Sequence, residues 1–307
     1  MQAATAGRDR AGHRRLAAPK RPAQRPAGRA GRHVPPRRRP LSHRHRAGTE
    51  GEGERKHMES ERRATDAPGT GWWTPAPRHV AYAHTRRSLT RLLERRQNAG
   101  GTPVPACPGW NVTDLVRHLV GICLAVRTRI VRGEDAEVPA LATATGPDSG
   151  DLRRLLELWA QLGAELDARV GGGTAELSEP LIMDAFTHEL DIRRALDEPP
   201  PVGHPAFAGS LDLVARGFCH AVRTAELPPL RVVSVGGPSW PSGPGEPVAT
   251  LRAAPWDLLR SLTGRRSPAQ LAALDWRGAD PAHWLPAFTW GPFTPPATAH
   301  ERPALAR

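Results

Sequence analysis

The sequence is poor in cysteine, and this scarcity excludes a fold held together by disulfides. Its 307 residues contain only Cys107, Cys123 and Cys219, which lie far apart and form no CxxC motif. Disulfide-stabilised domains carry many closely spaced cysteines, whereas a few isolated thiols are typical of a reducing compartment. We therefore expect a cytoplasmic protein.

Long apolar runs are absent as well. The most apolar stretch is interrupted by Arg117, Arg127 and Arg129, so it falls short of the roughly 18 apolar residues that a membrane-spanning helix needs. The first residues contain no apolar segment of the kind found in secretory signals. The sequence therefore predicts no membrane partner.

Acidic residues are scarce in one part of the chain only. Residues 1–57 contain 16 Lys and Arg but 4 Asp and Glu, so this basic arm carries the whole net charge of +12 and the rest is neutral. The arm consists mostly of Arg, Pro, Ala, Gly and His, which cannot bury enough apolar surface to fold. We expect it to be disordered, and we expect nucleic-acid binding, as one alternative function, only through this arm.

Lysine is nearly missing from the sequence. Only Lys20 and Lys56 occur, among dozens of arginines, which fits a GC-rich coding sequence in which any reading frame yields Arg, Pro, Ala and Gly. Our interpretation is that Met58 is the true start and that residues 1–57 are upstream sequence translated by mistake.

Beyond the arm, apolar residues recur mainly with helical spacing, so the sequence predicts a mainly α protein. A linker over 58–77 precedes a four-helix bundle at 78–227, and a small α+β domain at 228–291 precedes a loose tail at 292–307. Within the α+β domain we expect strands at 230–235, 247–251 and 271–276 and helices at 256–262 and 282–288. The helices of the bundle domain are predicted at 78–98, from Asn111 onward, at 151–170, at 179–197 and, as a fifth, at 205–226.

The second of these helices begins with a recognisable signal. Asn111 followed by Asp114 resembles a capping box. The apolar stripe that follows keeps helical spacing over four turns and has His118 at its edge; it consists of Leu115, Leu119, Ile122, Val126 and Ile130.

Three ionisable residues share one face of the fourth predicted helix. Asp184, His188 and Asp191 stand at i, i+4 and i+7, next to an apolar stripe. Such a row must be paired, hydrated or bound to a metal. His118 is the best candidate for a further ligand, because facing helices of a bundle can build a site between them.

Two histidines and one carboxylate form a ligand set typical of catalytic zinc or iron. Asp191 would then accept the other N–H of a ligating histidine. The alternative is an ordinary i, i+4 pair of Asp184 and His188 together with an unrelated, partly exposed His118.

Three motifs, in the same order, resemble the mycothiol-dependent maleylpyruvate isomerase family. The stretch PACPGWNVTDLVRHLVGI contains His118, DAFTHELDIRRAL contains Asp184 and His188, and SLTGRRSPAQLAALDWRG contains Arg265. The resemblance implies a DinB-like metal-binding bundle followed by a sterol-carrier-like C-terminal domain. It also implies that His118, Asp184 and His188 bind a metal, although we expect Glu in the isomerase itself where this chain has the shorter Asp184.

The resemblance further implies a function. We expect a divalent metal, zinc foremost, that holds mycothiol or another small thiol as its thiolate. The thiolate would add reversibly to a small electrophilic substrate, giving cis–trans isomerisation or S-transfer. A metal-binding or regulatory protein without turnover is the alternative on the same bundle.

Other residues of the motifs admit two interpretations each. Arg265 is our candidate catalytic residue, gripping a carboxylate of substrate or cofactor, with Arg266 as an equal choice and a solvated turn arginine as the alternative. Trp110 is expected to be a hydrophobic staple rather than a platform for a ligand. Cys107 could be a redox thiol, but the neighbouring Pro108-Gly109 turn favours a structural role.

Overall fold

The computed structural model describes residues 73–133, 151–171, 173 and 176–301. These residues all belong to a single compact unit, Glu61–Arg307. The predicted basic arm, most of the predicted linker and residues 134–150 lie outside the described residues. The predicted boundary between bundle and C-terminal domain stays a prediction.

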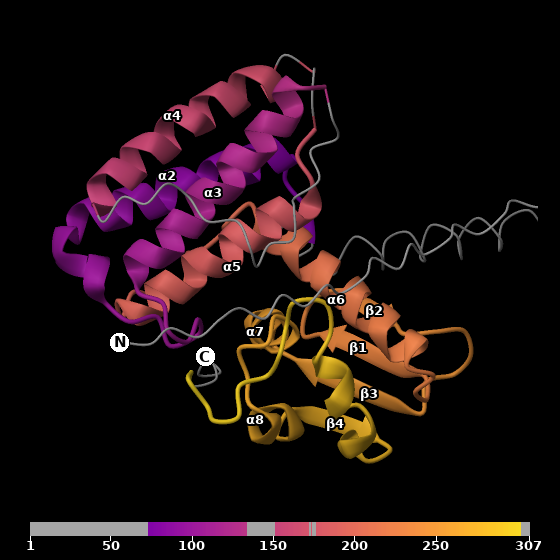
Figure 1. Cartoon of the computed structure of the whole chain (residues 1–307). Helices are drawn as coiled ribbons and strands as arrows, with labels where there is room; N and C mark the ends of the chain where they lie inside the picture. Colours follow the sequence, from indigo (N-terminus) through magenta and orange to yellow (C-terminus); the bar gives the residue numbers. More distant parts are fainter. Residues whose placement is uncertain (1–72, 134–150, 172, 174–175, 302–307) are drawn as a thin grey trace, which may run out of the picture. The chain divides into compact units, whose positions relative to one another are not determined.

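Four helices form the bundle that the sequence predicts (Figure 1). They are α2 (Arg78–Arg95), α3 (Val112–Val131), α4 (Leu152–Gly171) and α5 (Glu179–Ala195). Both α2 and α3 pack against α4 and against α5. The helix that carries His118 and the helix that carries Asp184 and His188 are therefore neighbours.

The interior of the bundle is apolar, as the helical spacing requires. The predicted stripe of α3 is buried from Leu115 to Val126, and it belongs to the same buried apolar cluster as Trp159 of α4 and Phe186 of α5. Each such side chain contributes roughly 1.5–3 kcal/mol when it leaves water. None of the described helices is long and apolar enough to cross a membrane.

A tight loop sets the start of α3. Trp110 N–H donates to the Cys107 carbonyl, and Gly109 adopts a φ of +83°, which side chains disfavour. The predicted capping box is confirmed, because the side chains of Asn111 and Asp114 each accept a hydrogen bond from the other's backbone N–H. These bonds fix the direction in which α3 leaves the loop.

The remaining described residues confirm the predicted α+β character. After α6 (Phe207–Thr224), a sheet forms in the order β2-β1-β3-β4. Central β1 and β3 are parallel, and both edge strands are antiparallel to their neighbours. The strands are β1 (Leu230–Ser234), β2 (Ser239–Pro241), β3 (Ala249–Ala253) and β4 (Asp275–Gly278).

Two predicted elements of this part are wrong in detail. The strand expected at 271–276 begins in helix α8 (Pro268–Ala272), because Ser267 and Gln270 form a capping box in front of it and strand β4 starts later. The helix expected at 282–288 consists of two 3₁₀ turns, Pro281–His283 and Leu285–Phe288, because Pro286 falls inside the expected helix and has no N–H to donate to the carbonyl four residues earlier. Helix α7 (Pro255–Leu262) matches its prediction within one residue.

The predicted loose tail at 292–307 contains two buried residues, Phe293 and Glu301. Phe293 packs edge-on against Trp290 and is buried. Glu301 is buried among arginines, which compensate its charge. The sequence pattern gave no sign of these contacts, and residues 302–307 lie outside the described part.

We expect the Asn111→Ala variant to lose about 1 kcal/mol of folding stability, because the backbone N–H of Asp114 loses its acceptor at the start of α3. Urea unfolding should measure the loss. Asn111→Ser retains a side-chain acceptor and should lose much less; equal losses in both variants would contradict the capping role.

Candidate metal centre

The three predicted ligands converge between α3 and α5. His188 Nε2 lies 3.3 Å from Asp184 Oδ1, and His118 Nε2 lies 3.6 Å from Asp184 Oδ2. One ligand atom of each residue lies within 4.8 Å of the other two. This spacing suits three groups arranged around one ion, so the arrangement the sequence predicts is present.

The carboxylate between the histidines fits a metal ion on chemical grounds. Asp184 is only 6% exposed, and its Oδ2 accepts no hydrogen bond. A buried carboxylate oxygen without a donor is costly. An ion shared with His118 and His188 would satisfy it.

Electrostatics at this point favour a positive charge. Burial alone would raise the pKa of Asp184, but the attraction of His188 and His118 outweighs burial and the pKa lies far below its usual range. Burial alone would lower the pKa of His188, yet the negative charge of Asp184 raises it well above its usual range. Without metal, a proton on His188 compensates Asp184; a divalent ion would take its place.

Asp191 holds His188 in the orientation that a ligand requires. Asp191 Oδ2 lies 3.0 Å from His188 Nδ1. An ionised carboxylate can only accept, so Nδ1–H donates and Nε2 faces Asp184. This contact is the arrangement that the sequence predicts for Asp191, while its role toward a metal stays a prediction.

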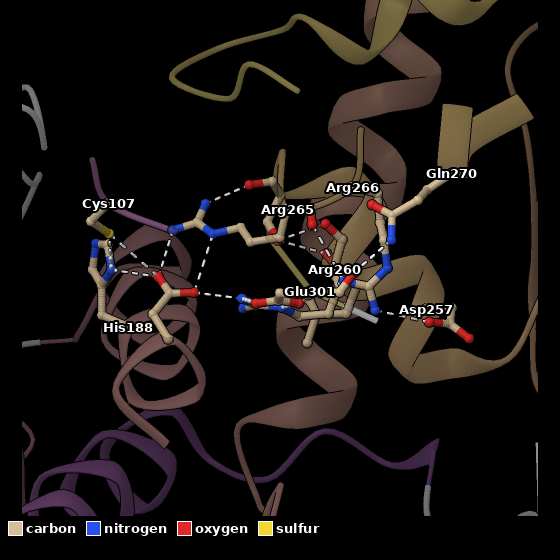
Figure 2. Close-up of polar contacts among 11 residues, drawn as sticks. Cys107, His188, Asp257, Arg260, Arg265, Arg266, Gln270 and Glu301 are labelled. Atoms are coloured by element: carbon tan, nitrogen blue, oxygen red, sulfur yellow. Dashed lines mark hydrogen bonds and ion pairs between the residues drawn. The ribbon is translucent and has the colours of Figure 1, made fainter. Parts of the chain in front are cut away.

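Two arginines, Arg260 and Arg265, compensate the buried charge of Asp191; both are labelled in Figure 2. Arg260 Nη2 lies 2.5 Å from Oδ1, and Arg265 reaches both oxygens, with Nη2 at 2.7 Å from Oδ2 and Nε at 3.3 Å from Oδ1. Burial alone would raise the pKa of Asp191, but Arg265 and Arg260 lower it far below its usual range. Asp191 therefore stays charged.

The structure favours Arg265 over Arg266, the two arginines that the sequence offered as equal candidates for binding a carboxylate. Arg265 lines the cavity that contains the ligands, and its side chain is only 11% exposed, so it is not a solvated turn residue. Arg266 bonds Asp257 and Glu301 and is absent from that lining. A role for Arg265 toward a ligand's carboxylate stays a prediction.

A cavity of about 280 Å³ opens onto the three predicted ligands. Its walls combine His118, Asp184, His188 and Arg265 with Cys107, Pro108, Trp110, Met183, Thr187, Pro292 and Phe293. Trp110 therefore faces the site, with its ring 5.4 Å from that of His118. A larger cavity of about 820 Å³ elsewhere contains no histidine or cysteine in its lining.

Cys107 belongs to the site rather than only to its turn. Its Sγ lies 3.7 Å from Asp191 Oδ2 and 3.9 Å from His188 Nδ1, so these three residues also could hold a metal. We favour the first set, because an ion beside Asp191 would be repelled by Arg260 and Arg265. The other thiols are buried, which raises the pKa of Cys123 to about 11 and that of Cys219 to about 12.

Sequence reasoning missed Arg260, which pairs with Asp191, and Glu301, which pairs with Arg260. Arg260 lies within the apolar face of α7, and a charged residue in such a face is a signal for a buried partner. Glu301 carried no comparable signal.

Comparison with known proteins gives one family. Residues 82–198 match the model of the mycothiol maleylpyruvate isomerase N-terminal domain. This range includes His118, Asp184 and His188, so the resemblance seen in the sequence is confirmed, whereas the C-terminal part lies outside the match. No curated protein matches the chain.

Two crystal structures are similar to this chain, one of the mycothiol-dependent maleylpyruvate isomerase and one of a histidine-to-alanine mutant of it. Both are 14% identical in sequence to this chain, and each alignment covers 61% of this chain and 88% of the chain in the crystal structure. The TM-scores are 0.41 and 0.42, respectively. A likeness at this level carries no conclusion about function.

We expect Asp191→Asn to lose about 3 kcal/mol of stability at pH 7 in metal-free protein, because Arg260 and Arg265 lose a buried counter-charge. The folded pKa of Asp191 lies below its unfolded value of about 3.9. Its contribution is therefore complete above that value and is lost as the pH falls toward the folded pKa.

Urea unfolding of wild-type protein and Asp191→Asn should be measured at pH 7 and at pH 3 with a chelator present. The difference between their free energies of unfolding should be smaller at pH 3. A difference of the same size at both values would contradict the assignment of a charged Asp191.

Proposed function

Because residues 82–198 belong to the mycothiol maleylpyruvate isomerase N-terminal domain family, we propose that the protein is a metal-dependent enzyme that uses a small thiol of the mycothiol type. The reaction is isomerisation or S-transfer on a small electrophilic substrate. The observation that supports this most directly is the meeting of His118, Asp184 and His188 at a cavity beside Arg265.

His118, Asp184 and His188 would hold the ion, with zinc the first choice for two imidazoles and a carboxylate. Three protein ligands leave a coordination position for a further ligand from the cavity. The bound ion supplies a Lewis acid that keeps a thiol ionised at neutral pH.

Residues around the proposed ion would orient its ligands and shield the cavity. Asp191 keeps Nδ1 of His188 protonated and so leaves Nε2 free for the ion. Trp110, Met183 and Phe293 form apolar walls beside the ligands. Such walls keep bulk water away from a thiolate and strengthen the electrostatic interactions inside the cavity.

Arg265 is the residue that would bind a carboxylate of substrate or thiol. Its Nε and Nη2 face Asp191, and Nη1 donates to the Thr263 carbonyl. An entering carboxylate would therefore compete with Asp191 for this guanidinium. Asp191 would keep Arg260 as its counter-charge during that exchange.

Asp184 leaves the reaction type open between isomerisation and transfer. Its side chain is one methylene shorter than the glutamate expected in the isomerase, which changes its reach to an ion. The same site without turnover would be a metal-binding regulatory protein. A thiol that enters the coordination sphere favours the enzyme, and we place that enzyme in the reducing cytoplasm, where its thiol would stay reduced.

We expect the cobalt-substituted protein to bind one equivalent of Co²⁺ and, on titration with mycothiol, to gain a near-ultraviolet thiolate-to-cobalt absorption band that saturates. His118→Ala should lose both the ion and the band. His220→Ala, which removes an exposed histidine of α6, is the matched control and should keep both.

Failure of the wild-type protein to bind Co²⁺ would contradict the metal site. A sulfur band present before any thiol is added would contradict the ligand set, since it would place Cys107 on the ion. An ion that binds without a band on thiol addition would favour the protein without turnover.

A further inference from the structure

The ligand His188 is connected to the end of the described chain by a series of buried ionic contacts (Figure 2). His188 contacts Asp191, Asp191 contacts Arg260, and Arg260 contacts Glu301. In the pair of Arg260 and Glu301, Nε also donates to Oε2 at 3.1 Å. The series runs from α5 through α7 into residues 290–301, which we call the C-terminal strap.

Glu301 is firmly held at the end of this strap. Its carboxylate accepts from Arg260 and, at 2.5 Å, from Arg266. Its backbone carbonyl accepts from Gln270 Nε2 at 2.6 Å. Burial of a carboxylate at 8% exposure is tolerable only with such partners.

Glu301 balances the charge of the buried ionic cluster beside Asp191. Three carboxylates face three arginines in this cluster, and their contacts alternate in sign; they are Asp191, Asp257, Glu301, Arg260, Arg265 and Arg266. Loss of Glu301 would leave one positive charge in excess beside Asp191. Arg260, whose Nη1 already lacks a hydrogen-bond partner, would then depend on Asp191 alone.

The strap also forms a wall of the metal cavity. Pro292 and Phe293 line it, two and three residues after Trp290, whose Nε1 donates to the Leu262 carbonyl. At Gly264, with a φ of +72°, a Cβ would lie 3.0 Å from the backbone of Thr294. The strap is therefore seated closely on the turn that carries Arg265.

We propose that Glu301 is a positioning residue for the metal ligand His188. It holds Arg260 against Asp191, and Asp191 in turn holds His188 Nδ1, so that Nε2 points at Asp184. The end of the strap thereby sets the affinity of the site for its ion. This inference rests on the proposed metal site. It adds Glu301, which does not bind the ion itself, to the residues on which that site depends.

The test is a double-mutant cycle of zinc affinity, measured by competition with a chromophoric chelator. Asp191→Asn, which removes the direct partner of His188, should weaken binding about 10–100-fold. Glu301→Gln acts one contact further away and should weaken it roughly 3–30-fold. The double variant should bind as weakly as Asp191→Asn alone, because both changes act through one carboxylate.

An unchanged zinc affinity in Glu301→Gln would overturn the inference. So would a double variant whose loss of affinity equals the product of the losses in the two single variants. Glu198→Gln is the matched control, since Glu198 pairs with the exposed Arg96 and should leave affinity unchanged. Circular dichroism on each variant separates loss of binding from loss of folding.

A second readout needs no metal. In ¹⁵N-labelled metal-free protein, the Nδ1–H proton of His188 should give a downfield signal, because it donates to a carboxylate. Glu301→Gln should move or broaden this signal, whereas Glu198→Gln should not; an unchanged signal would overturn the inference. If wild-type protein binds no zinc, the proposed function fails, yet this signal still decides whether Glu301 orients His188.

Discussion

The contact between the Asp191 carboxylate and the His188 imidazole determines what the site can do. It fixes which ring nitrogen carries the proton and leaves the other one facing Asp184 and His118. Asp191 can remain ionised in the interior only because Arg260 and Arg265 accompany it. The orientation of His188 in the helical bundle therefore depends on residues more than 60 positions later in the chain.

The two carboxylates of α5 differ in their attraction for a cation. Asp184 lies between two imidazoles with one oxygen that accepts no hydrogen bond. Asp191, only seven residues away, already pairs with Arg260 and Arg265, so a cation beside it would be repelled. This difference explains why His118, Asp184 and His188 form the better set, although Cys107, His188 and Asp191 satisfy the same distance criterion.

Local patterns in the sequence predicted the bundle and the ligand row. Helical spacing placed Asp184, His188 and Asp191 on one face of α5, and the capping box at Asn111 located the start of α3. The connection to Glu301 was not predictable, because its contacts join residues 69 and 41 positions apart through side chains that no local period relates. The elements at 268–278 were misjudged because Ser267 and Gln270 begin a helix inside a stretch that resembles a strand.

The most direct test of the account is zinc K-edge X-ray absorption on the zinc-loaded protein, before and after addition of mycothiol. The account predicts imidazole scattering with nitrogen and oxygen neighbours at about 2.0–2.1 Å at first, and a sulfur neighbour at about 2.3 Å only once the thiol is present. A spectrum without imidazole scattering, or with sulfur already bound in the absence of thiol, would contradict a centre built from His118, Asp184 and His188.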